Sequence, residues 1–328
     1  MATLRGRLNF TMNLCRLFAL GLEPNGVVAV VADAVILLAN LAFSGYVYHH
    51  VTSVVQQRMP LIWDVTTVMS VAKVFTYLLT PPVMLIAWEY NKRSLSAAVR
   101  ALDRAMTETA AAAPLTPFVK YSVQWMCVSI LTEYAGYTMF HLDTDFAYFT
   151  TTEYGMIAVY NVWTMVPLLM YTFMVDTIRA AVRDINGRLA TVADWQTYRG
   201  RWDDLRRVAV HLARDLFGVT IVVFIVRTIA EVVFFGFSLY LYGVKDQHDP
   251  VRIVVYSVNG SFSIAWMYEI IRMTKNCKLE IKYAYLYMLH ADLSFMPCNI
   301  FEMNYRSLKS IVTLVVAFLI FQVQMKLI

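Results

Sequence analysis

Charged residues are scarce in this sequence. Only 16% of its 328 residues are Asp, Glu, Lys or Arg, whereas 59% are hydrophobic. A soluble globular domain usually carries about 25% charged residues. The shortage therefore excludes an ordinary soluble domain and predicts several helices that cross a lipid bilayer. The net charge of +5 says little about nucleic acid, because the positions of the basic residues matter more than their sum, and we expect no nucleic-acid partner.

The patterns of common enzyme and metal-site classes are also missing from the sequence. The six histidines form no His-x-x-His or His-x-x-x-His pair, the spacing that membrane metalloenzymes need for their ligands. Neither a phosphate-binding glycine loop nor a nucleophile elbow is found. The four cysteines fall in segments predicted to be cytosolic or intramembrane, which argues against an extracellular disulfide framework. We therefore expect no enzyme, no cofactor and no metal site.

Long apolar stretches, by contrast, recur along the whole chain. The last one, residues 305–328, is long enough to cross the hydrocarbon layer of ~30 Å as a helix of about 20 residues. Six further spans are predicted at about residues 26–48, 60–88, 118–141, 150–175, 216–242 and 251–273. The predicted fold class is all-α, a polytopic membrane protein with seven transmembrane helices.

The basic residues predict how these spans are oriented. With the N-terminus inside, the cytosolic segments hold 21 Lys and Arg residues and the outer segments hold four. Because cytosolic loops carry the excess of Lys and Arg, the N-terminus is predicted in the cytosol and the C-terminus outside the cell, in a multi-pass protein of the plasma membrane. A G-protein-coupled receptor has the opposite orientation and is the less favoured alternative.

The chain is predicted to have three regions. Residues 1–25 form a cytosolic N-terminal segment, and residues 26–274 form a six-helix transmembrane bundle. Residues 275–328 comprise a cytosolic helix, a joint at 297–304 and the terminal transmembrane helix. Apolar residues keep helical spacing through the charged stretch 176–214. We therefore expect helices four to six to extend into the cytosol and to pack there.

Charged residues inside the predicted spans need partners. Arg227 and Glu231 are four residues apart on one helix face and can satisfy each other, and Lys73 lies near the middle of the second span. These three residues are the expected intramembrane ion pairs.

A ligand pocket needs apolar walls and a few converging polar groups. The candidates in the outer halves of the spans are Trp63, Ser70, Glu133, Tyr137, Glu153, Tyr154, Glu231, Tyr256 and Asn259. Carboxylates beside aromatic rings suit a polyol or an organic cation. The alternative is that the charged groups only neutralise one another inside the bundle.

Three stretches resemble those of a known family: FTMNLCRLFALGLEP near the N-terminus, HLARDLFG before the fifth span, and NIFEMNYRSLKSIVTLVVAFLIF at the end. They resemble the insect gustatory receptor family, within the gustatory and odorant receptor superfamily. That family's signature in the final helix is Thr-Tyr, five apolar residues, then Gln-Phe. Thr313 and Phe321 match this signature, while Leu314 and Ile320 replace the Tyr and the Gln.

The resemblance implies a chemosensory receptor for a small-molecule tastant that acts as a ligand-gated, non-selective cation channel. It implies a homo- or heterotetramer of related receptor subunits in the lipid bilayer, with the terminal helix lining the pore. The implied pore residues are Thr313, Ala317, Ile320, Phe321 and Gln324. Because Ile320 offers no polar group to a hydrated ion, a non-conducting protein of the same fold is the alternative. Gln324, one turn later, can supply such a group.

Overall fold

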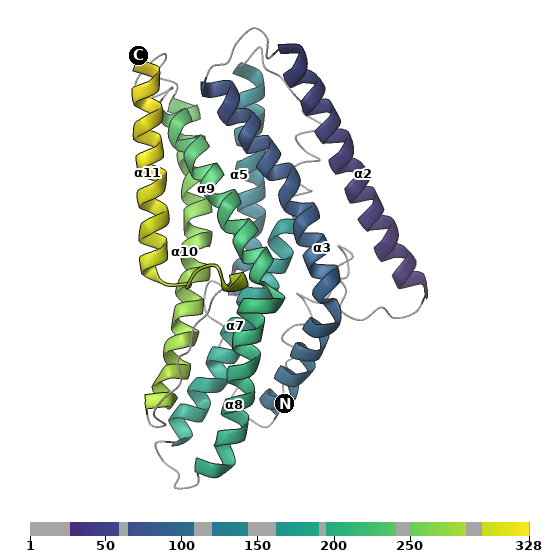
Figure 1. Ribbon diagram of the computed structural model, residues 1–328, viewed down its shortest axis with the longest axis vertical. Coiled ribbons are helices and arrows are strands. Elements are labelled where there is room, and N and C mark those ends of the chain that lie inside the picture. Colours follow the sequence, from purple (N-terminus) through teal and green to yellow (C-terminus); the bar gives the residue numbers. More distant parts are fainter. Residues whose placement is uncertain are drawn as a thin grey trace.

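The computed structural model describes residues 27–58, 65–107, 120–143, 162–189, 195–240, 250–286 and 297–327. The regular elements in these ranges are all helical, and Figure 1 shows them as one elongated bundle. They are α2 (Val27–Arg58), α3 (Val65–Thr107), α5 (Ser122–Asp143), α7 (Val162–Leu189), α8 (Trp195–His211), the π-helix η1 (Leu212–Leu216), α9 (Gly218–Tyr240), α10 (Pro250–Leu286), the 3-10 helix η3 (Pro297–Asn299) and α11 (Tyr305–Leu327).

Two of the helices are much longer than a bilayer is thick. α3 has 43 residues and α10 has 37, so at 1.5 Å per residue they measure about 65 and 55 Å against a hydrocarbon layer of ~30 Å. The polar stretch after residue 88, which the sequence placed beyond the second span, continues α3 as a helix to Thr107. It stays helical because Leu95, Val99 and Leu102 keep one face of it buried in the core.

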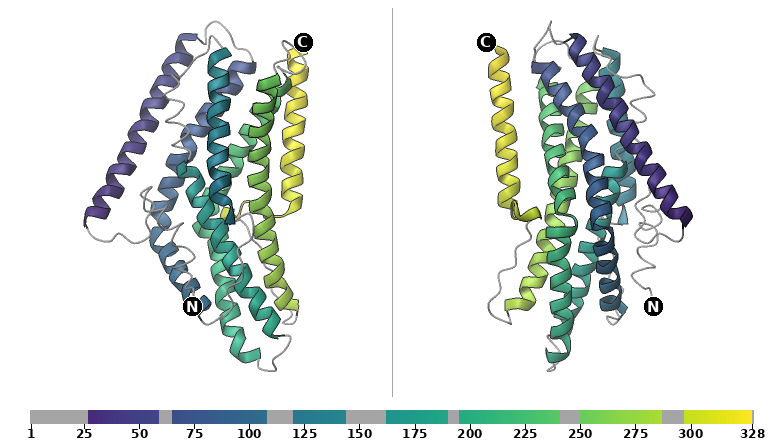
Figure 2. Two further views of the ribbon diagram at one scale, coloured as in Figure 1. Left: turned by 180° about the vertical axis from the view of Figure 1, so that it is seen from behind. Right: turned by 45° about the vertical axis from the view of Figure 1, so that its right-hand side comes forward.

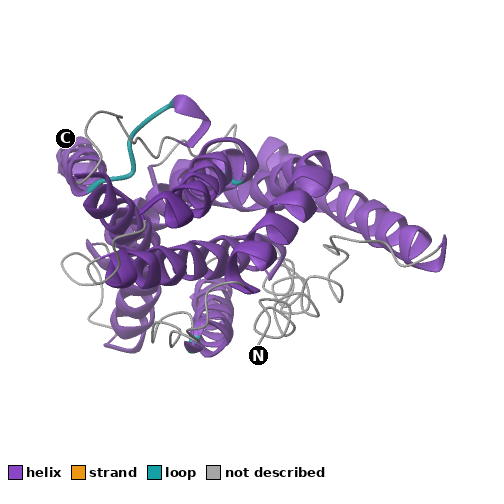
Figure 3. Cartoon of the chain, turned by 90° about the horizontal axis from the view of Figure 1, so that it is seen from below, coloured by secondary structure: helices purple, strands orange, loops and turns teal. Residues whose placement is uncertain are grey.

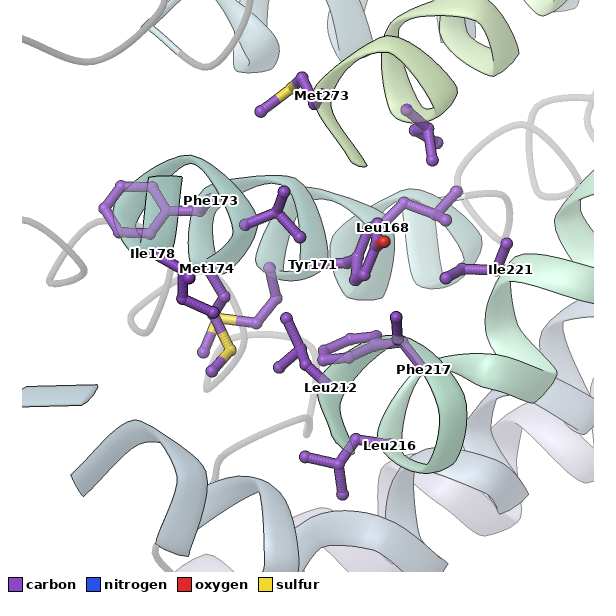
Figure 4. Packing of buried hydrophobic residues seen from close by; sticks show 14 of the residues in the cluster. Leu168, Tyr171, Phe173, Met174, Ile178, Leu212, Leu216, Phe217, Ile221 and Met273 are labelled. Carbon is purple, nitrogen blue, oxygen red and sulfur yellow. The ribbon is translucent and has the colours of Figure 1, made fainter. Parts of the chain in front are cut away.

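α7 is the central helix of the bundle. All residues from Thr164 to Ile178 are buried, and a helix that is buried on every side belongs to the core. Figure 4 shows Leu168 and Tyr171 of α7 facing Phe217, which follows η1. The ring centroids of Tyr171 and Phe217 are 5.5 Å apart, and the hydroxyl of Tyr171 lies 2.8 Å from Oγ1 of Thr274 in α10. α7 therefore joins the α9 side of the bundle to α10.

α2 and α11 occupy opposite flanks of the bundle (Figure 2). α2 packs along α3 and leaves Val35 and Leu38 58% and 64% exposed. α11 packs on α9 and α10 and leaves Leu314 63% exposed. Exposed apolar rows of this kind mark surfaces that meet lipid or another protein chain.

Two of the described helices can cross a membrane by length and composition. They are Thr164–Gly187, within α7, and Gly218–Tyr240, which is α9. α9 coincides with the predicted fifth span, whereas the apolar part of α7 reaches further toward the C-terminus than the predicted fourth span, residues 150–175. The domain boundary predicted at residue 274 lies inside α10, which continues unbroken to Leu286.

Candidate functional site

A buried ion pair lies where α9 faces α10. Nε of Arg227 is 2.6 Å from Oε1 of Glu231, and the two side chains are only 2% and 7% exposed. The pair forms because residues four apart share one face of a helix. The second carboxylate oxygen of Glu231 accepts a hydrogen bond from the hydroxyl of Ser263 in α10. The carboxylate thus has a partner on each of its oxygens, one from its own helix and one from the facing helix.

The same region of α10 is tied to α5. Nδ2 of Asn259 donates a hydrogen bond of 2.8 Å to the backbone carbonyl of Thr132, whose hydroxyl donates to the carbonyl of Ser129 at 3.0 Å. Asn259 is 4% exposed, so its side-chain amide bonds to protein groups and not to bulk water. α5, α9 and α10 are therefore held together by polar side chains in the middle of an apolar bundle.

The polar groups surround a cavity of about 10 Å³. Its lining combines Ser129, Arg227, Glu231, Asn259 and Ser263 with Met165, Phe224, Phe235 and Trp266. A cavity of this size holds about one water molecule. Apolar walls with a few converging polar groups are the chemistry that the sequence predicted for a pocket, yet in this conformation the helices are packed too closely to admit an organic ligand.

Lys73 of α3 lies against aromatic rings of α9. Its Nζ is 4.2 Å from the ring centroid of Phe234 and 4.1 Å from that of Phe235, and the residue is 5% exposed. A cation over the face of a ring is attracted by its quadrupole, more strongly when the pair is removed from water. We expected an ion pair for Lys73 from the sequence. The two aromatic rings are contacts of Lys73 that the sequence did not predict.

Phe235 links the polar cluster to the terminal helix. Its ring centroid is 5.9 Å from that of Tyr256 in α10. Phe235 and Tyr256 belong to one apolar cluster with Val315 of α11, which is 6% exposed. Nearby, a Cβ atom added to Gly236 would lie 3.0 Å from Cδ1 of Leu319. α11 therefore rests on the part of α9 that borders the cavity.

The structure brings three of the predicted pocket residues together, places three more on helices without describing their side chains, and does not describe the other three. Glu231, Tyr256 and Asn259 lie on the facing sides of α9 and α10. Ser70 lies on α3, and Glu133 and Tyr137 lie on α5, but their side chains are not among those described. The remaining three fall outside the described residues: Trp63, Glu153 and Tyr154.

The predicted pore residues share the side of α11 that faces away from the bundle. Those exposed are Thr313, Ala317, Ile320, Phe321 and Gln324, with Ile320 and Phe321 both 54% exposed. The opposite side packs against the other helices through Leu308, Ile311, Val315 and Leu319. Ile320 and Phe321 are adjacent and the other steps of the first set are three or four residues, so the set forms a continuous stripe along a helix.

The joint, residues 297–304, runs from the start of α9 to the start of α11, partway along the height of the bundle in Figure 1 and at its outer edge in Figure 3. Oδ1 of Asn304 accepts a hydrogen bond of 2.9 Å from the backbone N–H of Ser307, so Asn304 caps the start of α11. The carboxylate of Glu302 accepts hydrogen bonds from Nζ of Lys278 in α10 and from Nδ2 of Asn304. The hydrogen bond from Lys278, the largest effect, holds the pKa of Glu302 below its usual value.

The other end of the joint is pressed against the start of α9. Cys298 has a positive φ of 49°, in the left-handed region that non-glycine residues seldom adopt. A Cβ atom on Gly218 would lie 2.7 Å from the backbone nitrogen of Cys298, so only glycine allows this approach. Only Phe217 separates the π-helix η1 from Gly218, and the N–H of Phe217 donates to the carbonyl of Leu212 at 3.0 Å.

Glu302 and Gly218 were not predicted as functional residues. The Asn-x-x-Ser pattern by which Asn304 caps α11 was visible in the sequence.

Nearly the whole chain is similar in structure to a solved receptor. It matches the insect olfactory receptor OR5 from Machilis hrabei with a TM-score of 0.62 over 97% of both chains, at 13% sequence identity. No protein-family model matches the sequence, and no curated protein matches it. The likeness defines the fold, which is the helical architecture of an insect olfactory receptor over nearly its full length.

Proposed function

We propose that this chain is a subunit of a chemosensory receptor, a ligand-gated and non-selective cation channel of the plasma membrane. The observation that carries the proposal is the fold, which matches an insect olfactory receptor over 97% of both chains. The terminal helix supports a taste receptor in particular, because Thr313 and Phe321 match the final-helix signature of insect gustatory receptors.

In the proposed arrangement seven helices cross the bilayer, with the N-terminus in the cytosol. The distribution of 21 basic residues against four supports this orientation. The lower parts of α3, α8 and α10 then extend into the cytosol, since α3 and α10 are far longer than a bilayer requires. α11 crosses last and ends outside the cell.

The exposed stripe of α11 supports assembly around a pore. α11 packs on its own bundle along one side only. Its other sides must therefore contact lipid, other subunits or the water of a channel. In a tetramer the side that carries Thr313, Ala317 and Gln324 would line the channel, because it faces away from the subunit's own core. Leu314 and Phe318, 63% and 44% exposed, would meet neighbouring subunits or lipid.

The polar cluster between α9 and α10 is the proposed ligand site, which opens when a ligand separates the helices. The carboxylate of Glu231 is already neutralised by Arg227, so a neutral polyol that exchanges hydrogen bonds suits the site better than an organic cation. Movement of Phe235 at the cavity wall would reach α11 through Val315. Their shared apolar cluster connects the proposed ligand site to the pore helix.

Current recordings test the proposal. Cells that express the chain are challenged with a panel of sugars and sugar alcohols, and each responding ligand is retested on Ala317→Cys before and after a charged thiol reagent. We expect a cation current that the reagent blocks only in the variant. A current that persists unchanged in the modified variant would contradict a pore lined by α11.

A non-conducting protein of the same fold is the second candidate, and the composition of the stripe favours it. Ile320 occupies the position of the family's Gln and is 54% exposed, so an apolar side chain stands where a polar one is expected to meet ions. The variant Ile320→Gln distinguishes the two. A current that appears only in this variant identifies a non-conducting native chain, whereas equal currents with and without the substitution support the channel.

A further inference from the structure

We propose that the lower end of the bundle binds a soluble organic phosphate in a cleft between α3 and α8. The described residues enclose a space of about 520 Å³ there, within the range of ~300–1,000 Å³ that small-molecule sites occupy. Its walls come from the last two turns of α3 and from the middle of α8, which contact each other at the bottom of Figure 1. The cleft is separate from the polar cluster between α9 and α10.

The rim of the cleft is strongly cationic. Arg104 comes from α3, and Arg201 and Arg207 come from α8, against one carboxylate, Asp204. Nη1 of Arg207 lies 4.0 Å from Oδ1 of Asp204, and both side chains are more than 70% exposed. Such a solvated pair is weak, so the guanidinium of Arg207 retains N–H donors for a ligand. Planar guanidinium groups match the oxygens of phosphate in a bidentate manner.

The helix dipole explains the position of only one of the three arginines on the rim. A cation in the last turn of a helix stabilises the helix dipole, and Arg104 is in the last turn of α3. Arg201 and Arg207 lie within α8, away from its ends, so the dipole gives no reason for them. Their spacing places both at the edge of the same cleft as Arg104.

The floor of the cleft is apolar. Its half-buried apolar residues are Ala101 and Val208, and the neighbouring Leu102 and Leu205 are 0% and 1% exposed and so already out of water. An inorganic anion would gain nothing from the apolar surface of Ala101 and Val208, whereas a flat organic group covers it and removes it from water. An apolar floor below a cationic rim is therefore the chemistry of a nucleoside phosphate, with the base on Ala101 and Val208 and the phosphates on the guanidinium groups.

The depth of the cleft favours a soluble ligand over a lipid headgroup. Nδ2 of Asn91 in α3 donates to the carbonyl of Leu216 at 3.1 Å, next to the joint from which α11 enters the proposed membrane. Arg104 lies thirteen residues further along α3, about 20 Å at 1.5 Å per residue. A headgroup layer is only about 5–8 Å thick on each side of the hydrocarbon. This one step rests on the proposed membrane placement; the binding itself does not.

Binding to the purified full-length protein in detergent tests the proposal without any need for ion conduction. The probe is ATP, titrated in parallel with inorganic triphosphate, and nanodiscs that contain phosphatidylinositol bisphosphate are offered as a competitor. We expect ATP to bind more tightly than triphosphate. Arg104→Gln and Arg207→Gln should each weaken ATP binding about tenfold, which corresponds to about 1.4 kcal/mol.

Two matched variants sharpen the result. Arg93→Gln removes the same charge from an exposed position on α3 outside the cleft and should leave the affinity unchanged. Asp204→Asn removes the one carboxylate among the described residues of the rim and should tighten binding. Equal weakening by Arg93→Gln, or no saturable binding of ATP, would overturn the proposal. Direct binding of the nanodiscs that Arg104→Gln and Arg207→Gln weaken, with no binding of ATP, would assign the cleft to a lipid headgroup instead.

Discussion

The buried pair of Arg227 and Glu231 allows a prediction of stability. The substitution Glu231→Gln keeps the shape of the side chain and its acceptor for Ser263, but it leaves the charge of Arg227 without its counterion. Removing one partner of a buried ion pair costs about 3–5 kcal/mol, because the remaining charge stays out of water. Arg227 is 1% exposed, and the cavity beside it holds about one water molecule, so bulk water cannot solvate the charge without separating the helices.

Thermal unfolding of the detergent-solubilised protein, followed by tryptophan fluorescence, measures this cost. A chain of this length that unfolds as one unit has an unfolding entropy of roughly 0.7 kcal/mol/K, so the midpoint should fall by about 4–7 °C. The double variant Arg227→Met/Glu231→Gln removes both charges and should recover most of the loss. A single variant within about 1 °C of the native protein, or a double variant no better than the single one, would refute the reasoning.

Three further predictions concern the joint and are checked by the same unfolding assay. Gly218→Ala should lower stability by about 1–3 kcal/mol, because the new methyl group would overlap the backbone nitrogen of Cys298; an unchanged midpoint would show that the joint moves freely. Asn304→Ala should cost about 1 kcal/mol through the lost cap of α11, while Asn304→Ser should retain most of it. Glu302 has a lowered pKa in the folded chain, so its pairing with Lys278 stabilises the protein fully above the ordinary carboxyl pKa and less as the pH falls through the lowered value. Between pH 7 and pH 3 the native chain should therefore lose more stability than Glu302→Gln, and parallel pH profiles would contradict this.

Local patterns in the sequence were sufficient to predict the helices and one contact. Hydrophobic spacing predicted the all-helical architecture, because helix formation and burial depend on neighbours three and four residues away. The contact between Arg227 and Glu231 is of the same kind and was anticipated. The extent of α3 was underestimated, since the charged residues after position 88 conceal the buried stripe that ends at Leu102.

Contacts between distant segments could not be predicted in this way. Lys73 meets Phe234 and Phe235 across about 160 positions of sequence, and nothing in the spacing of either segment indicates the pairing. The same is true of Gly218 against Cys298, a contact that requires the left-handed backbone of the joint. The cleft between α3 and α8 likewise exists only because helices far apart in the sequence meet.

The orientation of the termini tests the central claim most directly, because it requires no knowledge of the ligand. Epitope tags at the two ends of the full chain are probed with antibodies in intact and in permeabilised cells. A seven-span channel of the proposed kind exposes the C-terminal tag in intact cells and the N-terminal tag only after permeabilisation. An N-terminal tag that is accessible in intact cells, with a hidden C-terminal tag, would contradict the account and favour a G-protein-coupled receptor.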